Sequence, residues 1–236
     1  MRSGLTRIGE VSMPCRVRAL QFITGCMVMA LFCGHAMAQK KPPSPAAPGE
    51  SEVIVEAVPP EVMASAVAAV AKLGEEVVLG RYQVAVERMN PMWKERAAKR
   101  MGGMNVLEKQ LASVAAQMVQ QGISMISFKP QGQPQAHEVA PGTKVVKENG
   151  ADVEKLVFTK WLVLVPTLRK IRIMREGIPK PLVVESTGYQ VAISDKGKIN
   201  WTFIDGSGLT INDLRGLFVT LPQNMELPPV KQQESR

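Results

Sequence analysis

The stretch from Leu182 to Gly206, LVVESTGYQVAISDKGKINWTFIDG, constrains the fold most, because its residues alternate as those of an antiparallel hairpin do. The first strand places these side chains on one face: Val183, Glu185, Thr187, Tyr189, Val191 and Ile193. Asp195-Lys196-Gly197-Lys198 forms the turn, and the return strand 199–204 alternates again around Trp201. Two strands are not stable alone in water, so the rest of the chain must cover one apolar face of this hairpin.

The first 38 residues have the features of a cleaved export signal. Four arginines precede an apolar run from Ala19 to Cys33, and Ala36-Met37-Ala38 resembles a signal peptidase site before Gln39. The run is shorter than the roughly 20 residues that a membrane span requires, so we expect no stable span after cleavage. The alternative is a lipoprotein box at 23–26, and either Met1 or Met13 could be the start. The sequence predicts an exported protein, periplasmic or secreted.

Cleavage would change the chemistry that is available to the protein. Cys15, Cys26, Cys33 and His35 would leave with the signal, so His137 would be the one histidine of the mature chain. This excludes thiolate nucleophiles and cysteine metal sites, and we expect no metal and no cofactor. Loss of four Arg and one Glu lowers the formal net charge from +8 to +5. That charge is too small to indicate a nucleic-acid partner.

Proline distribution divides the chain. Residues 39–59 hold five prolines and are expected to form an extended linker, and residues 223–236 are expected to form a flexible tail. A single α+β domain is predicted over 60–222, with N-terminal helices packed on a curved antiparallel sheet.

The first half of this domain has helical periodicity. One helix is expected from Pro60 to Gly80, and a second segment from Arg81 to Arg100 that Pro91 interrupts. A third helix is expected from Asn105 to Gly122, with Asn105 and Glu108 as a capping pair.

From Ile123 onward the pattern is that of strands. Strands are expected over 123–128, 143–147, 153–166 and 168–174, and Asn149-Gly150 is a turn. Residues 131–142 are expected to form a surface loop that contains His137, and 176–181 a Pro/Gly turn before the hairpin. Thr210 or Asn212 should cap a short helix that ends near Phe218.

Helices followed by long antiparallel strands resemble the nuclear transport factor 2-like superfamily. The segments GRYQVAVERMNPMWKE and SDKGKINWTFIDG are similar to those of exported members without assigned function. The resemblance covers about Pro60 to Pro222 and implies a cone-shaped sheet that often encloses a pocket. An enzyme of this superfamily would use an Asp or Glu base with a Tyr or acid that stabilises an oxyanion.

Candidate site residues follow from that expectation. Glu185 and Tyr189 share a strand face four residues apart and are the catalytic candidates, with Asp195, Asp205 and Tyr82 as further members. The alternative places Tyr189 in the core, Glu185 at a rim and both aspartates in turns.

Other residues are candidates for binding rather than catalysis. A ligand pocket would be lined by Tyr82, Trp93, Trp161, Tyr189 and Trp201, although large aromatic residues are also typical of a core. The basic stretch Arg169, Lys170, Arg172 and Arg175 does not form one stripe, and a solvated strand face is favoured.

Two functions remain open at this point. The chain is interpreted as a non-catalytic domain that binds a small apolar ligand, an envelope protein or a second copy of itself as a homodimer. The alternative is a small-molecule isomerase, dehydratase or hydrolase that uses a pocket carboxylate, since the fold alone does not decide function.

Overall fold

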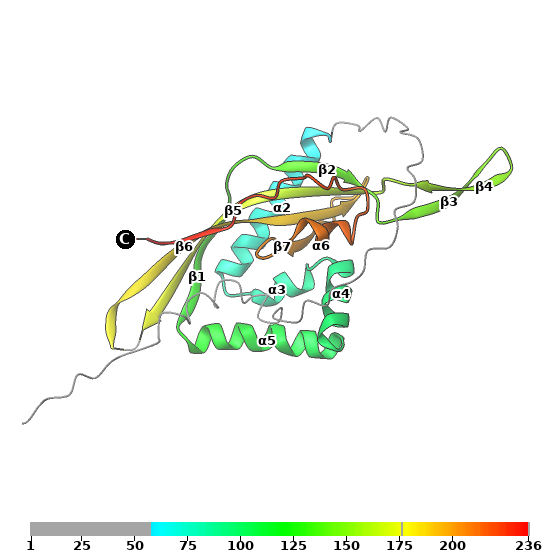
Figure 1. Cartoon of the computed structure of the whole chain (residues 1–236). Coiled ribbons are helices and arrows are strands. Elements are labelled where there is room, and N and C mark those ends of the chain that lie inside the picture. The colour runs from blue at the N-terminus through cyan, green and yellow to red at the C-terminus, as the bar shows by residue number, and fades with distance from the viewer. Residues whose placement is uncertain (1–57, 176, 236) are drawn as a thin grey trace, which may run out of the picture.

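A computed structural model describes residues 58–175 and 177–235, and it has the predicted α+β architecture of helices packed on a curved antiparallel sheet (Figure 1). The export signal and nearly all of the linker lie outside the described residues. The helices of the first half are α2 (Pro60–Val78), α3 (Tyr82–Glu87), α4 (Pro91–Met101) and α5 (Met104–Gln120). Among the described residues, no helix is both long enough and apolar enough to cross a membrane.

The predicted break at Pro91 is confirmed. α3 ends at Glu87 and α4 begins at Pro91, where a proline needs no hydrogen-bond acceptor for its missing N–H. The side chain of Asn90 caps α4 by accepting a hydrogen bond of 3.2 Å from the backbone N–H of Trp93. The chain therefore turns between α3 and α4 for a local reason that the sequence contains.

The predicted capping pair of α5 is wrong. The helix begins one residue earlier, after Gly103, and no side chain caps it. Gly102 and Gly103 have φ values of 89° and 135°, so two glycines in conformations that L side chains disfavour make the turn. Glu108 pairs instead with Lys94 of α4, at 3.0 Å between Nζ and Oε1.

The second half supplies the strands, all of which pair antiparallel. Their bounds are β1 (Ile123–Pro130), β2 (Gln135–Val139), β3 (Thr143–Glu148), β4 (Ala151–Leu156), β5 (Lys160–Arg175), β6 (Ile178–Asp195), β7 (Thr202–Asp205) and β8 (Lys231–Ser235), and α6 covers Ile211–Arg215. In the described part of the chain, six strands form the main sheet in the order β1-β5-β6-β7, with β2 beside β5 and β8 beside β6.

The long pair β5 and β6 is the centre of the sheet. It pairs from Lys160 opposite Asp195 to Arg175 opposite Ile178, with one register shift between Ile173 and Arg175. The predicted strand over 153–166 is therefore wrong: β4 and β5 are separate, and β5 continues through Pro166 to Arg175. The predicted turn over 176–181 is too long, because Ile178–Pro181 belong to β6. Pairing with β6 at fifteen positions of β5 outweighs the local preference of proline and glycine for loops.

The predicted hairpin of β6 and β7 is confirmed, with a longer loop. Ile193 lies opposite Thr202, so the return strand begins three residues later than expected. Within the loop, Ser194 Oγ donates to the Lys198 carbonyl at 2.8 Å. Ile199 is 82 % exposed, whereas Trp201 is buried and its Nε1 donates to Ser65 Oγ of α2 at 2.9 Å.

The hairpin is covered on both faces, not on the single face that we predicted. On the helix face, Ala192 and Phe203 pack with the buried side of α2. On the opposite face, Tyr189 and Val191 pack with α6 and the segment that follows it. This second face is covered because residues 206–227 return across the sheet (Figure 1). Thr210 caps α6 in a reciprocal capping box, as one of our two alternatives predicted.

Three segments differ from the loops and tails that we expected. His137 lies in β2, opposite Leu162, and not in a loop. Residues 231–235, expected in a flexible tail, form β8 against Val183–Thr187. β3 and β4 form a hairpin that projects away from the body (Figure 1), and its predicted Asn149-Gly150 turn has φ values of 50° and 83°.

Candidate binding cleft

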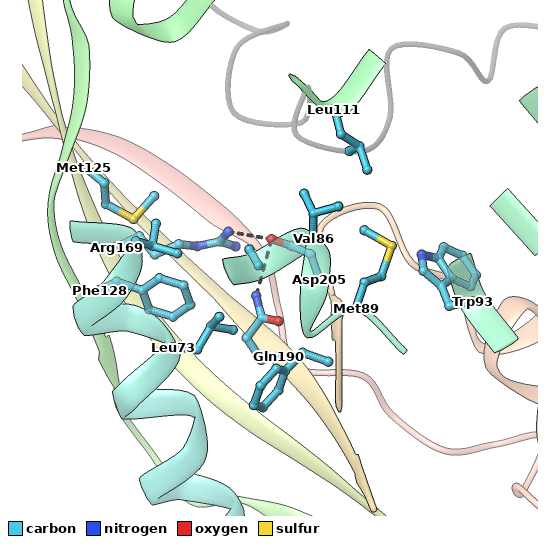
Figure 2. Close-up of a pocket in the computed structure, with 13 residues that line it drawn as sticks. Leu73, Val86, Met89, Trp93, Leu111, Met125, Phe128, Arg169, Gln190 and Asp205 are labelled. Carbon is cyan, nitrogen blue, oxygen red and sulfur yellow. Dashed lines mark hydrogen bonds and ion pairs between the residues drawn. The ribbon is translucent and has the colours of Figure 1, made fainter. Parts of the chain in front are cut away.

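A small cavity lies between the helix face of the sheet and the helices that cover it (Figure 2). Its volume is about 70 Å³. Four helices and four strands contribute the lining residues, which are mostly apolar: Leu73, Val77, Ala85, Val86, Met89, Trp93, Leu111, Met125, Phe128, Arg169, Gln190, Phe203 and Asp205. We call this space the inner cavity.

Three polar side chains meet at the sheet side of the inner cavity. Arg169 of β5 donates through Nη1 to Asp205 Oδ2 at 2.9 Å, and Gln190 of β6 donates to the same oxygen at 3.4 Å (Figure 2). Ser207 completes the network, because its backbone N–H donates to Asp205 Oδ1 at 2.7 Å and its Oγ accepts from Arg169 Nη2 at 3.0 Å. A charged pair is thus placed in a largely apolar wall.

The Arg169 side chain is almost completely buried. The residue is 6 % exposed, and its guanidinium carbon lies 5.8 Å from the centre of the Phe128 ring. A Cβ at Gly188 would lie 2.7 Å from Arg169 Nη2, so glycine at this strand position leaves room for the guanidinium. The Nε–H of Arg169 has no hydrogen-bond partner among the described residues.

Asp205 is held in its ionised form. Burial by itself disfavours the charge, but the Arg169 guanidinium and the hydrogen bonds from Ser207 outweigh burial, so the pKa of Asp205 lies below its ordinary value. Its side chain is 18 % exposed. The Arg169–Asp205 pair is therefore a neutral unit of two opposite charges near neutral pH.

A larger cleft of about 580 Å³ adjoins the inner cavity and separates α3 from α5. Val86 and Leu111 line both spaces, so these two side chains form the wall between them. The floor of the cleft is apolar, and charged or amide side chains surround it. Its full lining is Tyr82, Gln83, Val86, Glu87, Lys94, Glu108, Leu111, Ala112, Val114 and Ala115. We call this space the outer cleft.

The five aromatic residues predicted to line a pocket are not brought together. Trp93 lines the inner cavity and Tyr82 lines the outer cleft. Trp161 and Trp201 lie in the core on the helix face. Tyr189 lies in the core on the opposite face, as our alternative for it stated.

Of the predicted catalytic candidates, Glu185, Tyr189 and Asp195 lie outside both spaces, whereas Asp205 lines the inner cavity and Tyr82 lines the outer cleft. Glu185 pairs with Lys170 across the strands, and this hydrogen bond, opposed by partial desolvation, lowers the pKa of the carboxyl group. The Tyr189 hydroxyl donates to the Leu209 carbonyl at 3.5 Å, and its pKa is raised by burial and then by the Asp205 charge. Asp195 pairs with Lys160 and Lys198 at the hairpin loop.

The sequence analysis did not predict the Arg169–Asp205 pair, although the pattern of β5 contained a signal for it. Arg169 shares odd-numbered positions of β5 with Val163, Val165 and Ile171, all of which are buried on the helix face. A single arginine in such a row indicates a buried partner. Our expectation of a solvated basic strand is wrong for Arg169, although Arg172 is exposed and donates to Ser124 Oγ at 3.3 Å.

His137 is partly buried in β2 and not the surface residue that we expected. Its Nε2 is buried without a hydrogen-bond partner among the described residues, and desolvation lowers the pKa of the ring. The ring does not line either space.

We searched the structure for a metal site and compared the chain with known proteins. Over residues 58–175 and 177–235, no group of three or more His, Cys, Asp or Glu side chains lies close enough to hold a metal ion. The chain matches no protein-family model, no curated protein and no solved structure.

Proposed function

We propose that this protein is an exported, non-catalytic binding domain of the nuclear transport factor 2-like fold, and that it holds a small, mostly apolar ligand between α3 and α5. The observation that carries this proposal is the outer cleft, an apolar floor with a polar rim that adjoins a buried charged pair. Ligand sites of proteins are concave, mostly apolar and furnished with a few placed polar groups.

The size of the cleft supports a small-molecule ligand. Its volume of about 580 Å³ lies within the range of roughly 300–1,000 Å³ that is typical of small-molecule sites. The inner cavity alone, at about 70 Å³, has room for only one end of such a molecule. A ligand would therefore place its apolar body in the outer cleft.

The burial of α5 also supports a ligand there. Leu107 is the buried residue of this helix, whereas Leu111, Val114 and Met118 on its inner side are only partly buried. Completing the burial of one such side chain contributes up to about 1.5–3 kcal/mol. An apolar ligand in the cleft would supply that contact surface.

The chemistry of the carboxylates favours binding over catalysis. A general base works best when its pKa lies near the working pH. Asp205, the carboxylate that lines the inner cavity, has a lowered pKa and is already paired with Arg169. Glu185 lies outside the cavity, beside Lys170. These contacts support a structural and recognition role for both acids.

A matched pair of variants tests the proposal. Ala115 lines the outer cleft, whereas Ala116 is exposed on the next position of α5 and does not line it. We expect the neutral dye N-phenyl-1-naphthylamine to bind with one-to-one saturation. Ala115→Phe should weaken binding about tenfold or more, because the ring would fill the cleft, and Ala116→Phe should leave it unchanged. Equal binding by both variants, or no saturable binding to the native chain, would refute the proposal.

Export is tested separately from binding. We expect the protein that is recovered outside the cytoplasm to begin at Gln39, since the predicted cleavage follows Ala38. N-terminal sequencing of that fraction gives the answer, and an intact N-terminus would contradict cleavage.

A further inference from the structure

We propose that the protein forms a two-fold symmetric dimer in which β3 of one copy pairs with β3 of a second copy, antiparallel and edge to edge. The observation that carries this proposal is a projecting hairpin with exposed apolar side chains, whose outer edge is complementary to itself. None of the residues that line the outer cleft belongs to this hairpin, so the inference stands apart from the proposed function.

β3 and β4 form a two-stranded sheet of their own, which we call the arm (Figure 1). The arm leaves the body between Val139, the last residue of β2, and Lys160, the first residue of β5. Every residue of β4 is exposed. The large apolar side chains that are exposed on the arm are Val145, Val146, Val153 and Leu156. A two-stranded hairpin is only marginally stable in water, so a further strand paired with the arm would stabilise it.

The turn of the arm determines which backbone groups point outward. Asn149 and Gly150 have φ values of 50° and 83°, and Glu148 lies opposite Ala151, as in a type I′ hairpin. In such a hairpin the pair beside the turn is hydrogen-bonded, and hydrogen-bonded pairs then alternate with non-hydrogen-bonded ones. The N–H and C=O groups of residues 143, 145 and 147 therefore point away from β4. No other strand of the described chain pairs with this edge, and an unpaired edge is a template for another strand.

One register through these outward groups is self-complementary. It places Val146 opposite Val146 of the second copy and Val145 opposite Lys147. Lys144 then lies opposite Glu148 of the second copy, and the symmetry forms this pair of opposite charges twice. Opposite charges that face each other across two strands stabilise a sheet, and such a symmetric contact is typical of homodimers.

The same register joins the apolar residues of the two arms. Val153 lies opposite Val146 within each arm. Pairing about Val146 therefore forms a row of four valines across the four strands, and each valine of the row gains an apolar neighbour or lies beside one that does. Contacts between β-branched side chains across strands stabilise a sheet further.

Other edge pairings are less complementary. A register of β3 that is centred one residue earlier places Lys144 opposite Val146 and forms no pair of opposite charges. Pairing of β4 with its own copy about Glu154 opposes two glutamates, and pairing about Val153 places Asp152 opposite Glu154. Like charges that face each other destabilise a sheet, so the sequence favours β3 and the register centred on Val146.

Cysteine cross-linking tests this register. Residues 39–236 contain no cysteine, so one introduced cysteine reports on one position. Opposed residues of a non-hydrogen-bonded pair have Cα atoms about 4.5 Å apart, which a disulfide can bridge. The two copies of residue 145 would lie diagonally, about 7–8 Å apart, which is too far. Under mild oxidation we expect Val146→Cys to form a covalent dimer at least about tenfold faster than Val145→Cys.

Val145 is a stringent control for this experiment. It is the neighbouring valine on the same strand, and it is 63 % exposed whereas Val146 is 37 % exposed, so random collision would favour cross-linking at Val145. Equal rates for the two variants, or no covalent dimer of Val146→Cys, would overturn the proposal.

Exchange of charges tests the ion pairs. Lys144→Glu and Glu148→Lys each place like charges opposite one another, so each should weaken dimerisation about tenfold or more in sedimentation equilibrium. An equal mixture of the two variants restores both pairs of opposite charges, and it should form a heterodimer as stable as the native dimer. The same charge changes on β4, Lys155→Glu and Glu154→Lys, should change the dissociation constant by less than about threefold.

The remaining outcomes are equally decisive. A native chain that sediments as a monomer would overturn the dimer. A mixture of Lys144→Glu with Glu148→Lys that associates no better than either variant alone would overturn the pairing of the two β3 edges. The arm is a separate two-stranded sheet, so all these variants should keep the circular dichroism spectrum of the native chain.

Discussion

Neutralising Asp205 would leave Arg169 as an unpaired charge that is only 6 % exposed. Removing one partner of a buried ion pair costs about 3–5 kcal/mol, because the remaining charge has lost its hydration. The Asp205 side chain is 18 % exposed, which places the site near the lower end of that range. We therefore expect Asp205→Asn to lower the free energy of unfolding by about 3 kcal/mol.

The opposite single variant should cost less. Arg169→Met leaves Asp205 with the N–H of Ser207 at 2.7 Å and with some access to water, so we expect a loss of about 2 kcal/mol. The double variant leaves no lone charge buried, so it should lose less than Asp205→Asn alone, about 2 kcal/mol. The two single losses would then exceed the double loss by about 3 kcal/mol, which is the coupling energy between the two residues.

Urea unfolding followed by far-ultraviolet circular dichroism measures these values. A loss of 3 kcal/mol corresponds to a fall in Tm of about 6–12 °C for a domain of this size. Arg172→Met is the matched control, because that arginine lies on the same strand but is exposed, and it should change stability by no more than about 0.5 kcal/mol. Additivity of the two single losses within 0.5 kcal/mol would refute the reasoning, since it would show that the pair does not interact.

Two further predictions test the packing and the pH response. Gly74→Ala should lower the free energy of unfolding by about 1–3 kcal/mol, because a Cβ there would lie 2.5 Å from the backbone oxygen of Phe128. Gly142→Ala, where the Cβ meets nothing within 4 Å, should be nearly neutral in the same urea unfolding assay. The lowered pKa of His137 means that the unfolded chain binds more protons, so the stability that neutral His137 contributes should be complete above pH 6.5 and decrease as the pH falls below it. Denaturant unfolding between pH 5 and 7.5 measures this free energy of unfolding. If the stability of His137→Leu decreases with falling pH as steeply as that of the native chain, the prediction is contradicted.

The elements that could be predicted from the sequence are those whose signals are local. The break at Pro91 needs only the geometry of proline, and the Asn149-Gly150 turn needs only residues that tolerate positive φ. The capping role of Thr210 likewise depends on residues within one helical turn. The order of helices before antiparallel strands, and hence the α+β class, followed from periodicity alone.

The errors occur where long-range pairing overrides such local signals. Pro166 lies inside β5 because the whole strand pairs with β6, and β8 forms because β6 offers an open edge at Val183–Thr187. Tyr189 and its neighbours are buried because residues 206–227 return across that face. None of these contacts is visible in a window of a few residues.

The sequence by itself therefore determined the class of fold, the main turns and the types of side chain that could carry chemistry. The tertiary structure decided which of those side chains meet. Arg169 and Asp205 are separated by 36 positions in the chain, and only the pairing of β5 with β6 and of β6 with β7 places their side chains 2.9 Å apart. Burial strengthens the attraction between these two charges, because the energy of a charge interaction depends on how much water the surrounding fold excludes.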